Sequence, residues 1–557
     1  MGQPHQLRSF WGVWRRSRRS LWQYLGLFLG CCLLVVGCSS DRPSPSASSP
    51  AATDSNRIVL GTTAKVRTLD PADATEILAS NLLYNLGDRL YAYKSGTNEL
   101  QPQLATALPT VSDDGLTYTI PVREGVTFHD GEPFNAEAMA FSLRRFIENG
   151  GQPAFLLADI VESVEATGDY ELTIKLQKPF AAFPNLLTIS GTCAVSPKAY
   201  AIGAGQFKPD TFIGTGPYKL AQYNTDSLRF DAFEGYWGEK PSNDGVDIQI
   251  FSSPANLFNT FRTRGVDVAY QNLDLDQIRT LQQGAQQGGW QVIEGNGNGI
   301  HYVSLNVLSE PLDKLEVRQA IAAAIDRPLL RDRVFQGQVE PLYSLLPNTL
   351  DASEPTFQTA YGDANKAKAL ELLQKAGYSK ENPLTIEFWY RANLTSNALA
   401  ATTLKAAVEQ SLEGALIFDL KSVEAATAYQ NLDKGIYPTF LLDWAPDFFD
   451  ADNYIQPFLA CAQGSAEQGC QEGSTKSQGS FYYNARMNEL IDQQRQTQDD
   501  GDRQKLLAEI QTITAQDVPF IPLWQNKEFL FVQQGVSGAG LDPTQRVALW
   551  AIRKSPA

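Results

Sequence analysis

A run of carboxylates set among aromatic rings is the clearest candidate for chemistry in this sequence. It reads Asp443-Trp444-Ala445-Pro446-Asp447-Phe448-Phe449-Asp450, and Asp452 follows closely. The rings of Trp444, Phe448 and Phe449 would lower the local dielectric around Asp447 and strengthen its attraction for a bound cation. The alternative is that Asp447 caps a turn before Phe448, which is a common role for Asp. The other acids of the run are rivals for the same role.

Few other residues could support catalysis or direct metal binding. The sequence has three histidines, His5, His129 and His301, and the first lies in a segment that we expect to be removed. The rest of the chain contains no HExxH, GxSxG or Walker A pattern. We therefore expect no enzyme, no metal site and no cofactor. A hydrolase that uses a pair of carboxylates stays open as an alternative, because the 62 acids offer many pairs.

The cysteines point to an oxidising compartment. Cys461 and Cys470 flank the Gly-, Ser- and Gln-rich segment AQGSAEQG, so we expect a disulfide that closes this loop. A redox or metal-binding pair is the alternative, although the CxxC spacing is absent. Cys193 lies in an apolar stretch and is expected to be a buried free thiol.

The N-terminus has the features of an export signal. Residues 8–19 are basic, and residues 24–37 are almost wholly apolar but short for a membrane span. Val35-Val36-Gly37-Cys38 resembles a bacterial lipobox, which implies cleavage of residues 1–37 and lipid on Cys38. An uncleaved anchor helix is the alternative, and either reading places the body outside the cytoplasm at a membrane surface.

Two further features concern export and partners. Ser17-Arg18-Arg19-Ser20-Leu21 resembles a twin-arginine signal, which leaves the export route open. Residues 39–56 are rich in Ser, Pro and Ala and have no apolar period, so they predict a flexible tether behind the lipidated Cys38. Without the five arginines of the first 37 residues, the net charge falls from −16 to −21. This acidity disfavours nucleic acid as a partner.

The body mixes strands and helices. Residues 57–61, 116–122 and 170–176 predict strands, and Pro121 suggests an edge strand or a strand end. Four helical stretches follow from apolar spacing and caps: one after Asn135, one around 317–325, one from 363 to 377, and a pair between 487 and 516 that breaks near Gly501.

Six blocks in order resemble the extracellular solute-binding proteins of bacterial dipeptide, oligopeptide and nickel importers. The resemblance covers about residues 57–553. The Asp-Val usual in the second block is Met139-Ala140 here. The blocks are TLDP with LLYNL and LY (68–91), QPQLA through DDGLTYTIPVREGVTFHDGEPFNAEAMAFSLRR (101–145), GTGPYKL (214–220), VRQAIAAAIDR (317–327), DWAPDFFD (443–450) and VPFIPL (518–523).

This resemblance implies an α/β fold of the periplasmic-binding-protein type II class in its large, three-lobed form. Lobe I would comprise residues 57–80, 205–300 and 521–557, lobe II residues 81–204, and lobe III residues 301–520. Ligand would lie between lobes I and III, which close on it through a hinge.

The resemblance also implies positions for ligand contacts. Asp447 aligns with the Asp that meets the ligand's ammonium group in peptide-binding members, beside Trp444, Phe448 and Phe449. Some dipeptide-binding members use an Arg near Arg391 for the ligand's carboxylate, which a guanidinium could bind through two hydrogen bonds; a solvated loop Arg is the alternative. Thr68 and Leu69 lie where lobe I approaches ligand, unless they only form the turn before Pro71.

The predicted function is therefore that of a monomeric, lipid-anchored binding protein. It would capture short peptides and deliver them to an ABC permease and its ATPase. A nickel chelate, haem, an oligosaccharide or an opine-like solute stays open as the ligand. A receptor that feeds another partner also stays open, since the sequence does not separate it from an importer subunit.

Overall fold

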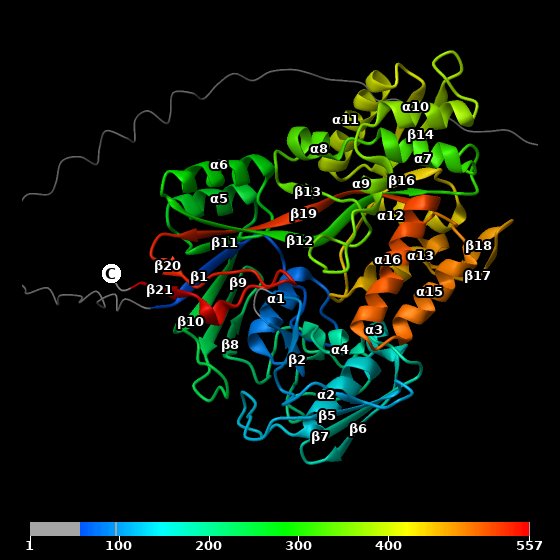
Figure 1. The fold of residues 1–557 in the computed structure, drawn as a ribbon. Helices are drawn as coiled ribbons and strands as arrows, with labels where there is room; N and C mark the ends of the chain where they lie inside the picture. Colours follow the sequence, from blue (N-terminus) through cyan, green and yellow to red (C-terminus); the bar gives the residue numbers. More distant parts are fainter. Residues whose placement is uncertain (1–55, 95–96, 556–557) are drawn as a thin grey trace, which may run out of the picture. The chain divides into compact units, whose positions relative to one another are not determined.

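The computed structural model describes residues 56–94 and 97–555, and these residues pack as one compact unit (Figure 1). The expected signal peptide, the lipidated Cys38 and nearly all of the tether lie outside the described residues. Within the described part, no helix is both long enough and apolar enough to cross a membrane.

One mixed sheet runs through most of the unit. Its order is β15-β14-β16-β12-β19-β11-β1-β10-β9-β8, and β13 pairs with β19 at one side. The strands are parallel where β1 meets β10 and β11 and where β14 meets β15 and β16. Their bounds are β1 (Ile58–Thr62), β8 (Tyr218–Tyr223), β9 (Ser227–Ala232), β10 (Gly245–Ile250), β11 (Val268–Tyr270), β12 (Trp290–Leu305), β13 (Val339–Pro341), β14 (Leu384–Arg391), β15 (Leu416–Val423), β16 (Thr439–Trp444) and β19 (Phe520–Gln533).

Two long antiparallel strands, β12 and β19, connect the two halves of this sheet and cross the centre of Figure 1. β19 pairs with β11 near its C-terminal end, and β12 pairs with β16 near its own. Their register shifts between Asn296 and Ile300. Gly297 lies in this bulge, where a Cβ atom would come within 2.9 Å of the carbonyl oxygen of Asn526. Glycine thus allows the two backbones to approach where the ladder is interrupted.

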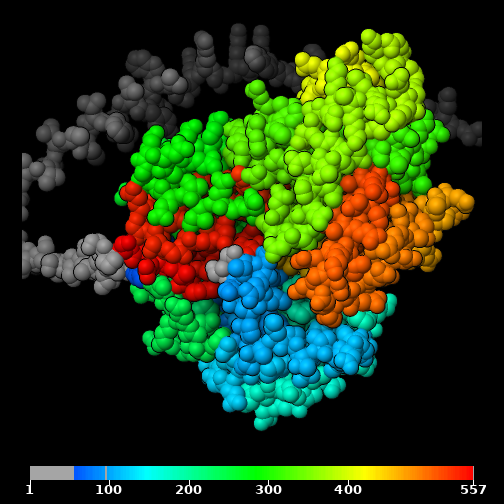
Figure 2. Space-filling view, viewed as in Figure 1, coloured from blue at the N-terminus to red at the C-terminus, as the bar shows by residue number. Residues whose placement is uncertain are grey.

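The half of the sheet that contains β1 has a core on each face. Helix α1 (Ile77–Leu86) packs on one face, where Leu78, Leu82 and Leu83 join the same apolar cluster as Ile58 of β1. Helices α5 (Pro254–Arg262) and α6 (Leu275–Gln286) cover the other face through a smaller cluster. Figure 2 shows the C-terminal segment in red beside residues of the β11–β12 region in green, although the two are far apart in the sequence.

The half that contains β14 is also covered on both faces. One apolar cluster holds residues of α7 (Leu315–Ala324), α10 (Lys366–Lys375) and α11 (Thr395–Ser411). The other cluster holds residues of α13 (Gln456–Leu459), α15 (Ala485–Gln496) and α16 (Asp500–Asp517). In β16 the four residues 439–442 are all buried, as expected for a strand that is covered on both faces.

A separate sheet of order β4-β5-β7-β6 forms its own core with α2 (Ala136–Glu148). Its strands are β4 (Thr110–Val111), β5 (Thr117–Pro121), β6 (Val161–Gly168) and β7 (Glu171–Leu176). Asn135 caps α2 by accepting a hydrogen bond from the Ala138 amide at 2.9 Å. The buried pair Asp70–Arg145, joined at 2.7 Å, links this helix to the turn after β1.

The remaining helices and strands are short. They are β2 (Tyr91–Tyr93), β3 (Leu100–Pro102), α3 (Phe155–Ala158), α4 (Phe183–Leu186), η1 (Ser190–Thr192), α8 (Arg327–Leu329), η2 (Leu330–Val334), α9 (Thr356–Tyr361), α12 (Ala425–Tyr429), η3 (Leu432–Lys434), η4 (Ala451–Tyr454), β17 (Cys461–Ser465), β18 (Gly469–Gly473), α14 (Ser474–Ser477), β20 (Val536–Ser537), η5 (Leu549–Ala551) and β21 (Arg553–Lys554).

The predicted elements are found close to their expected places. Pro121 is the last residue of β5, so it ends a strand as predicted. The helix expected from residue 363 to 377 is α10, which spans residues 366–375 and is capped by Asn365; Asp363 precedes it and pairs with Arg327 at 3.1 Å. The break between α15 and α16 precedes Gly501, which lies inside α16. The boundaries of the three lobes stay a prediction, and α1 packs with β1 although residue 81 was the expected start of lobe II.

Candidate functional site

The predicted acidic run follows β16, the neighbour of β12 in the sheet. Trp444, at the end of β16, pairs with Ile300, directly after the bulge in β12. Downstream, the Tyr454 hydroxyl donates a hydrogen bond of 2.8 Å to the carbonyl oxygen of Asn298 inside that bulge. The loop 445–453 is thus held at both ends against the bulge between the two halves of the sheet.

Two acids of this loop are neutralised by arginines of the helix pair α15–α16. Arg503 donates to both carboxylate oxygens of Asp450 at 2.9 and 2.5 Å, and Asn185 donates to the same group at 2.8 Å. Arg495 lies 3.3 Å from Asp452. Burial alone would raise the pKa of Asp450, but the Arg503 guanidinium helps to hold it below its usual range. These two carboxylates therefore fix the loop to the helices.

Arg391 is similarly occupied, by an acid of the same run. It forms an ion pair with Asp443 and donates to the Tyr429 hydroxyl at 2.7 Å. Its side chain is largely buried, and it is not among the residues that line the cavity around Asp447. The two groups predicted to hold the ends of a ligand are therefore not brought together.

Asp447 differs from Asp443, Asp450 and Asp452 because it has no ion-pair partner among the described residues. Its amide donates to the Asn453 side chain at 2.9 Å. The residue is open to a cavity, yet the surrounding protein partly removes its carboxylate from water. This burial raises the pKa of Asp447, and a hydrogen bond from Asn453 acts in the opposite direction. A carboxylate in this state gains from a bound cation.

Asp447 lines a cavity of about 310 Å³, which we term the inner cavity. Its walls come from parts of the chain that are distant in sequence. They are the α1 region (74, 75, 77, 80 and 81), residues 153 and 156, the segment 188–191, residues 298 and 299 of β12, the loop 445–449, residues 526 and 528 of β19, and the C-terminal segment 544–546. The volume is within the range of small-molecule sites.

Asp447, Glu528 and Arg546 are the ionisable side chains in this lining, and none of the three forms an ion pair within the described part of the chain. Arg546 donates to the carbonyl oxygen of Thr188 at 3.1 Å, and its guanidinium lies 5.4 Å from the ring centroid of Tyr84. Burial lowers the pKa of Arg546, and the charge of Asp542, which accepts a hydrogen bond from the Arg546 backbone amide at 2.8 Å, acts in the opposite direction. The inner cavity thus presents charges of both signs.

Amide side chains supply further polar groups. Asn81, Asn298 and Asn526 line the inner cavity together with Gln545. The Gln545 Nε2 atom is buried and has no hydrogen-bond partner within the described residues. An unpaired donor in a cavity wall can be satisfied by a carbonyl group of a ligand.

The aromatic residues of the acidic run have separate places. Phe448 packs into the core of the β4–β7 sheet, 6.2 Å from Phe180, and Phe449 lies 5.6 Å from Tyr93. Both still border the inner cavity. Trp444 lines a neighbouring cleft of about 780 Å³, which Asp447 and Phe448 also border. We term this the side cleft.

Thr68 and Leu69 do not face the inner cavity. They are 1% and 0% exposed, Leu69 belongs to the core beside β1, and the Thr68 hydroxyl accepts a hydrogen bond from the Asp70 amide at 3.0 Å. The hydrogen bond to Asp70 places Thr68 in the turn before Pro71, and ligand contact by Thr68 or Leu69 stays a prediction. The part of the chain that reaches the cavity here is the start of α1.

The cysteines and histidines have structural environments. A disulfide joins Cys461 of β17 to Cys470 of β18, and Cys193 is a buried free thiol. Burial lowers the pKa of His129 to about 4, and its two ring nitrogens contact the backbone at Gly214 and Gly216. The described residues contain no group of three His, Cys, Asp or Glu side chains placed to hold a metal ion.

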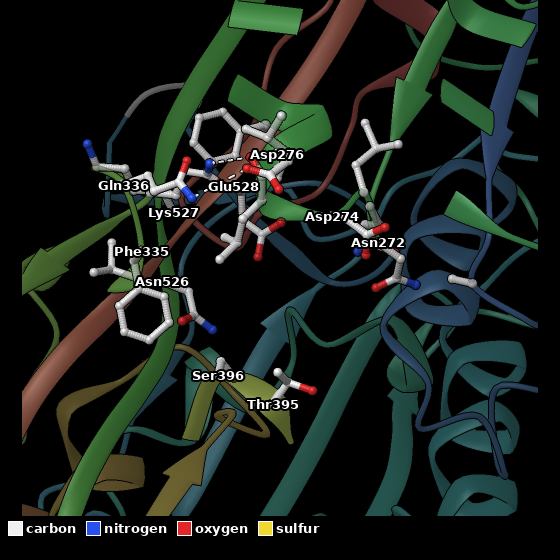
Figure 3. Close-up of a pocket in the computed structure, with 18 of the residues that line it drawn as sticks. Asn272, Asp274, Asp276, Phe335, Gln336, Thr395, Ser396, Asn526, Lys527 and Glu528 are labelled. Carbon is white, nitrogen blue, oxygen red and sulfur yellow. Dashed lines mark hydrogen bonds between the residues drawn. The ribbon is translucent and has the colours of Figure 1, made fainter. Parts of the chain in front are cut away.

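Glu528 and Arg546 were missed by sequence reasoning. Neither lies in a motif, and the absence of an ion partner depends on the packing of distant segments. Glu528 also borders a much larger cleft of about 940 Å³, shown in Figure 3, together with Asn526 and Ile77. We term it the outer cleft. The inner cavity and the outer cleft adjoin at these three residues.

Comparisons with known proteins identify the family. Residues 99–466 match the bacterial extracellular solute-binding proteins, family 5 Middle. The chain is 28% identical over 465 residues to the glutathione-binding protein GsiB of Pectobacterium atrosepticum, which covers 81% of this chain and 85% of the relative. It is 28% identical over 502 residues to the dipeptide-binding protein of Escherichia coli strain K12, which covers 83% and 87%.

Solved structures agree on the fold. HbpA2 from Haemophilus parasuis superposes with a TM-score of 0.78 at 22% identity and covers 90% of this chain and 100% of its own. A dipeptide-binding protein from Pseudoalteromonas sp. SM9913 in complex with Met-Leu gives 0.70 at 23% identity, with 89% and 100% covered. The predicted type II periplasmic-binding-protein fold is confirmed. Because the family match spans more than half of the sequence, this chain belongs to the bacterial extracellular solute-binding proteins, family 5.

Proposed function

We propose that this chain is the substrate-binding lipoprotein of an ABC importer and that it captures short peptides in the inner cavity. The family is one of extracellular solute-binding proteins, and two relatives are named for dipeptides and for glutathione. The observation that carries the peptide assignment is Asp447, the acid of its loop that has no cation partner among the described residues. A peptide's ammonium group would complete that pair.

The carboxylate end of the peptide would bind Arg546 and not Arg391. Arg546 borders the same cavity as Asp447 and forms no ion pair among the described residues, whereas Arg391 already pairs with Asp443. A zwitterion loses less free energy on burial when each end meets an opposite charge. The unpaired Gln545 donor and the other amides of the wall suit the peptide backbone between the two ends.

Capture would proceed by closure of the predicted lobes I and III on the ligand. Residues 74–80 and 544–546 of lobe I and residues 445–449 of lobe III border the inner cavity. The bulge between Asn296 and Ile300 interrupts the ladder of the two shared strands, so the change in angle is expected there. The closed form would then dock on the permease, while lipid on Cys38 would keep the monomer at the membrane outside the cytoplasm.

The first experiment identifies the natural ligand. The full chain is purified without refolding, denatured, and the released molecules are analysed by mass spectrometry. Short peptides, recovered chemically unchanged after incubation with fresh protein, are the expected result. A sugar or a metal chelate as the sole ligand would contradict the peptide assignment, and conversion of the ligand would contradict a pure binding role.

The second experiment tests Asp447 by calorimetry. Asp447→Asn should weaken the binding of Ala-Ala by about 30-fold or more, because it leaves the ammonium group without a counter-charge. Wild-type protein should bind N-acetyl-Ala-Ala, which lacks the ammonium group, with an affinity reduced by a similar factor relative to Ala-Ala. Asp433→Asn, which changes an exposed acid on η3 outside the cavity, is the matched control. Equal affinities of Asp447→Asn and Asp433→Asn would remove Asp447 from the site.

A further inference from the structure

Glu528 stands where the inner cavity meets the outer cleft. It lies on β19 opposite Gly295 of β12, close to the bulge between the two halves of the sheet. Asn526 and Ile77 are its companions in both linings. Figure 3 shows Glu528 with Asn526 and Lys527 at the wall of the outer cleft. A group bound in the inner cavity that extends toward the outer cleft would pass this carboxylate.

The two lysines that line the outer cleft with Glu528 form no ion pair with it. Lys527 is bound to Glu294 and Glu340, both at 2.7 Å. Lys65, at the rim of the outer cleft, is exposed and forms no ion pair with Glu528 within the described residues. Tyr270 is close enough to feel the charge, and its hydroxyl donates to the carbonyl oxygen of Gln545 at 2.9 Å. Glu528 is thus a second acid in the site without a counter-charge.

The charges of the inner cavity do not match a simple zwitterion. Asp447 and Arg546 would bind the ammonium and carboxylate groups of a peptide, and Glu528 would then have no partner in such a ligand. Glu528 is half-buried and has no ion-pair partner among the described residues. A carboxylate that is partly removed from water without a partner is unfavourable, so its presence in a ligand site favours a cation supplied by the ligand. We propose that the preferred ligands are short peptides with a basic side chain, which forms an ion pair with Glu528.

The protonation of Glu528 fits this arrangement. Burial raises its pKa to about 7, so the empty site holds the carboxyl group partly protonated at neutral pH. A lysine or arginine side chain of the ligand would favour the ionised form and lower that pKa. A neutral side chain would leave the acid as it is.

The inference rests on the proposed peptide function, and the experiment separates the two. Calorimetry on the full chain compares Ala-Lys and Lys-Ala with Ala-norleucine and norleucine-Ala, which lack only the ammonium group of the side chain. At least one lysine peptide should bind about 10- to 100-fold more tightly than its norleucine counterpart. In Glu528→Gln this preference should fall to nearly one, while the affinity for the norleucine peptides should be retained.

Glu165→Gln, an exposed acid on β6 far from the site, is the matched control and should keep the full preference. Equal affinities for lysine and norleucine peptides in the wild type would overturn the inference and leave the peptide function standing. A lysine preference that survives Glu528→Gln would also overturn it. Failure of the wild type to bind any of the four peptides would contradict both.

Discussion

Asp450 and Asp452 face Arg503 and Arg495 across the contact between loop 445–453 and the helices α15–α16, whereas Asp447 in the same loop faces the inner cavity without a cation. In the contact between the loop and the helices, each of the two carboxylates is paired with an arginine. In the cavity wall, Asp447, Glu528 and Arg546 form no ion pair with any described residue. The comparison separates charges that hold the loop in place from charges available to a ligand.

Loss of a paired charge should cause the largest change in the free energy of unfolding. Arg503→Met leaves Asp450, which is 6% exposed, without its main counter-charge. We expect the free energy of unfolding to fall by ~3–5 kcal/mol, measured by urea denaturation. Arg486→Met, which removes an exposed arginine paired with Glu509 and Glu489, should cost ~1 kcal/mol or less. Similar losses in the two variants would mean that the Asp450 contact does not hold the loop.

Removal of an unpaired charge should raise the free energy of unfolding, whereas removal of a paired charge lowers it. The pKa of Glu528 in the folded protein, about 7, lies above the ordinary value of about 4.5. The folded state therefore binds more protons than the unfolded state between these values, and the contribution of Glu528 to stability falls as the pH rises from 4.5 to 7.

Glu528→Gln should consequently match the wild type near pH 4.5 and become more stable than it by ~3 kcal/mol at pH 8. The neighbouring Tyr270 does not titrate in this range, because burial raises its pKa further. Urea denaturation at a series of pH values measures the difference. A constant difference between the two proteins across the series would show that Glu528 is not a buried, unpaired acid.

The smallest effect on stability is expected at Asp447. Asp447→Asn removes a charge that has no ion partner, so the free energy of unfolding should change by no more than ~1 kcal/mol. Asp450→Asn in the same loop should cost several times as much, because it strands Arg503. A loss at Asp447 as large as that at Asp450 would mean that Asp447 has a structural partner, and the contrast between the two regions would fail.

Much of the fold could be predicted because local patterns and packing agree. The Asn135 cap and the apolar spacing that follows it are properties of neighbouring residues, and α2 begins and packs as they indicate. The family blocks supplied the topology that no local pattern contains. The expected start of α10 at residue 363 was three residues early, because Asp363 pairs with Arg327, a contact fixed only by tertiary structure.

The site was less predictable. The position of Asp447 in the acidic run was visible, but the ion pairs of its rivals join residues that are far apart in the sequence. The Arg391–Asp443 pair could not be predicted either, because its two residues are also far apart in the sequence. Glu528 and Arg546 gave no signal, because a charge without a partner is recognisable only when all its neighbours are known. Thr68 and Leu69 were placed by family position, and burial set them in a turn behind the cavity.

The two strands that both halves of the large sheet share also affect how fast the predicted lobes open and close. β12 and β19 keep most of their ladder on each side of the interruption at Asn296 and Ile300. Rotation about that point changes a few backbone dihedral angles and exposes neither core, so its barrier is expected to be low. Opening and closing should then take microseconds to milliseconds. The residence time of a ligand would be set by its contacts in the closed form, and not by the speed of the hinge.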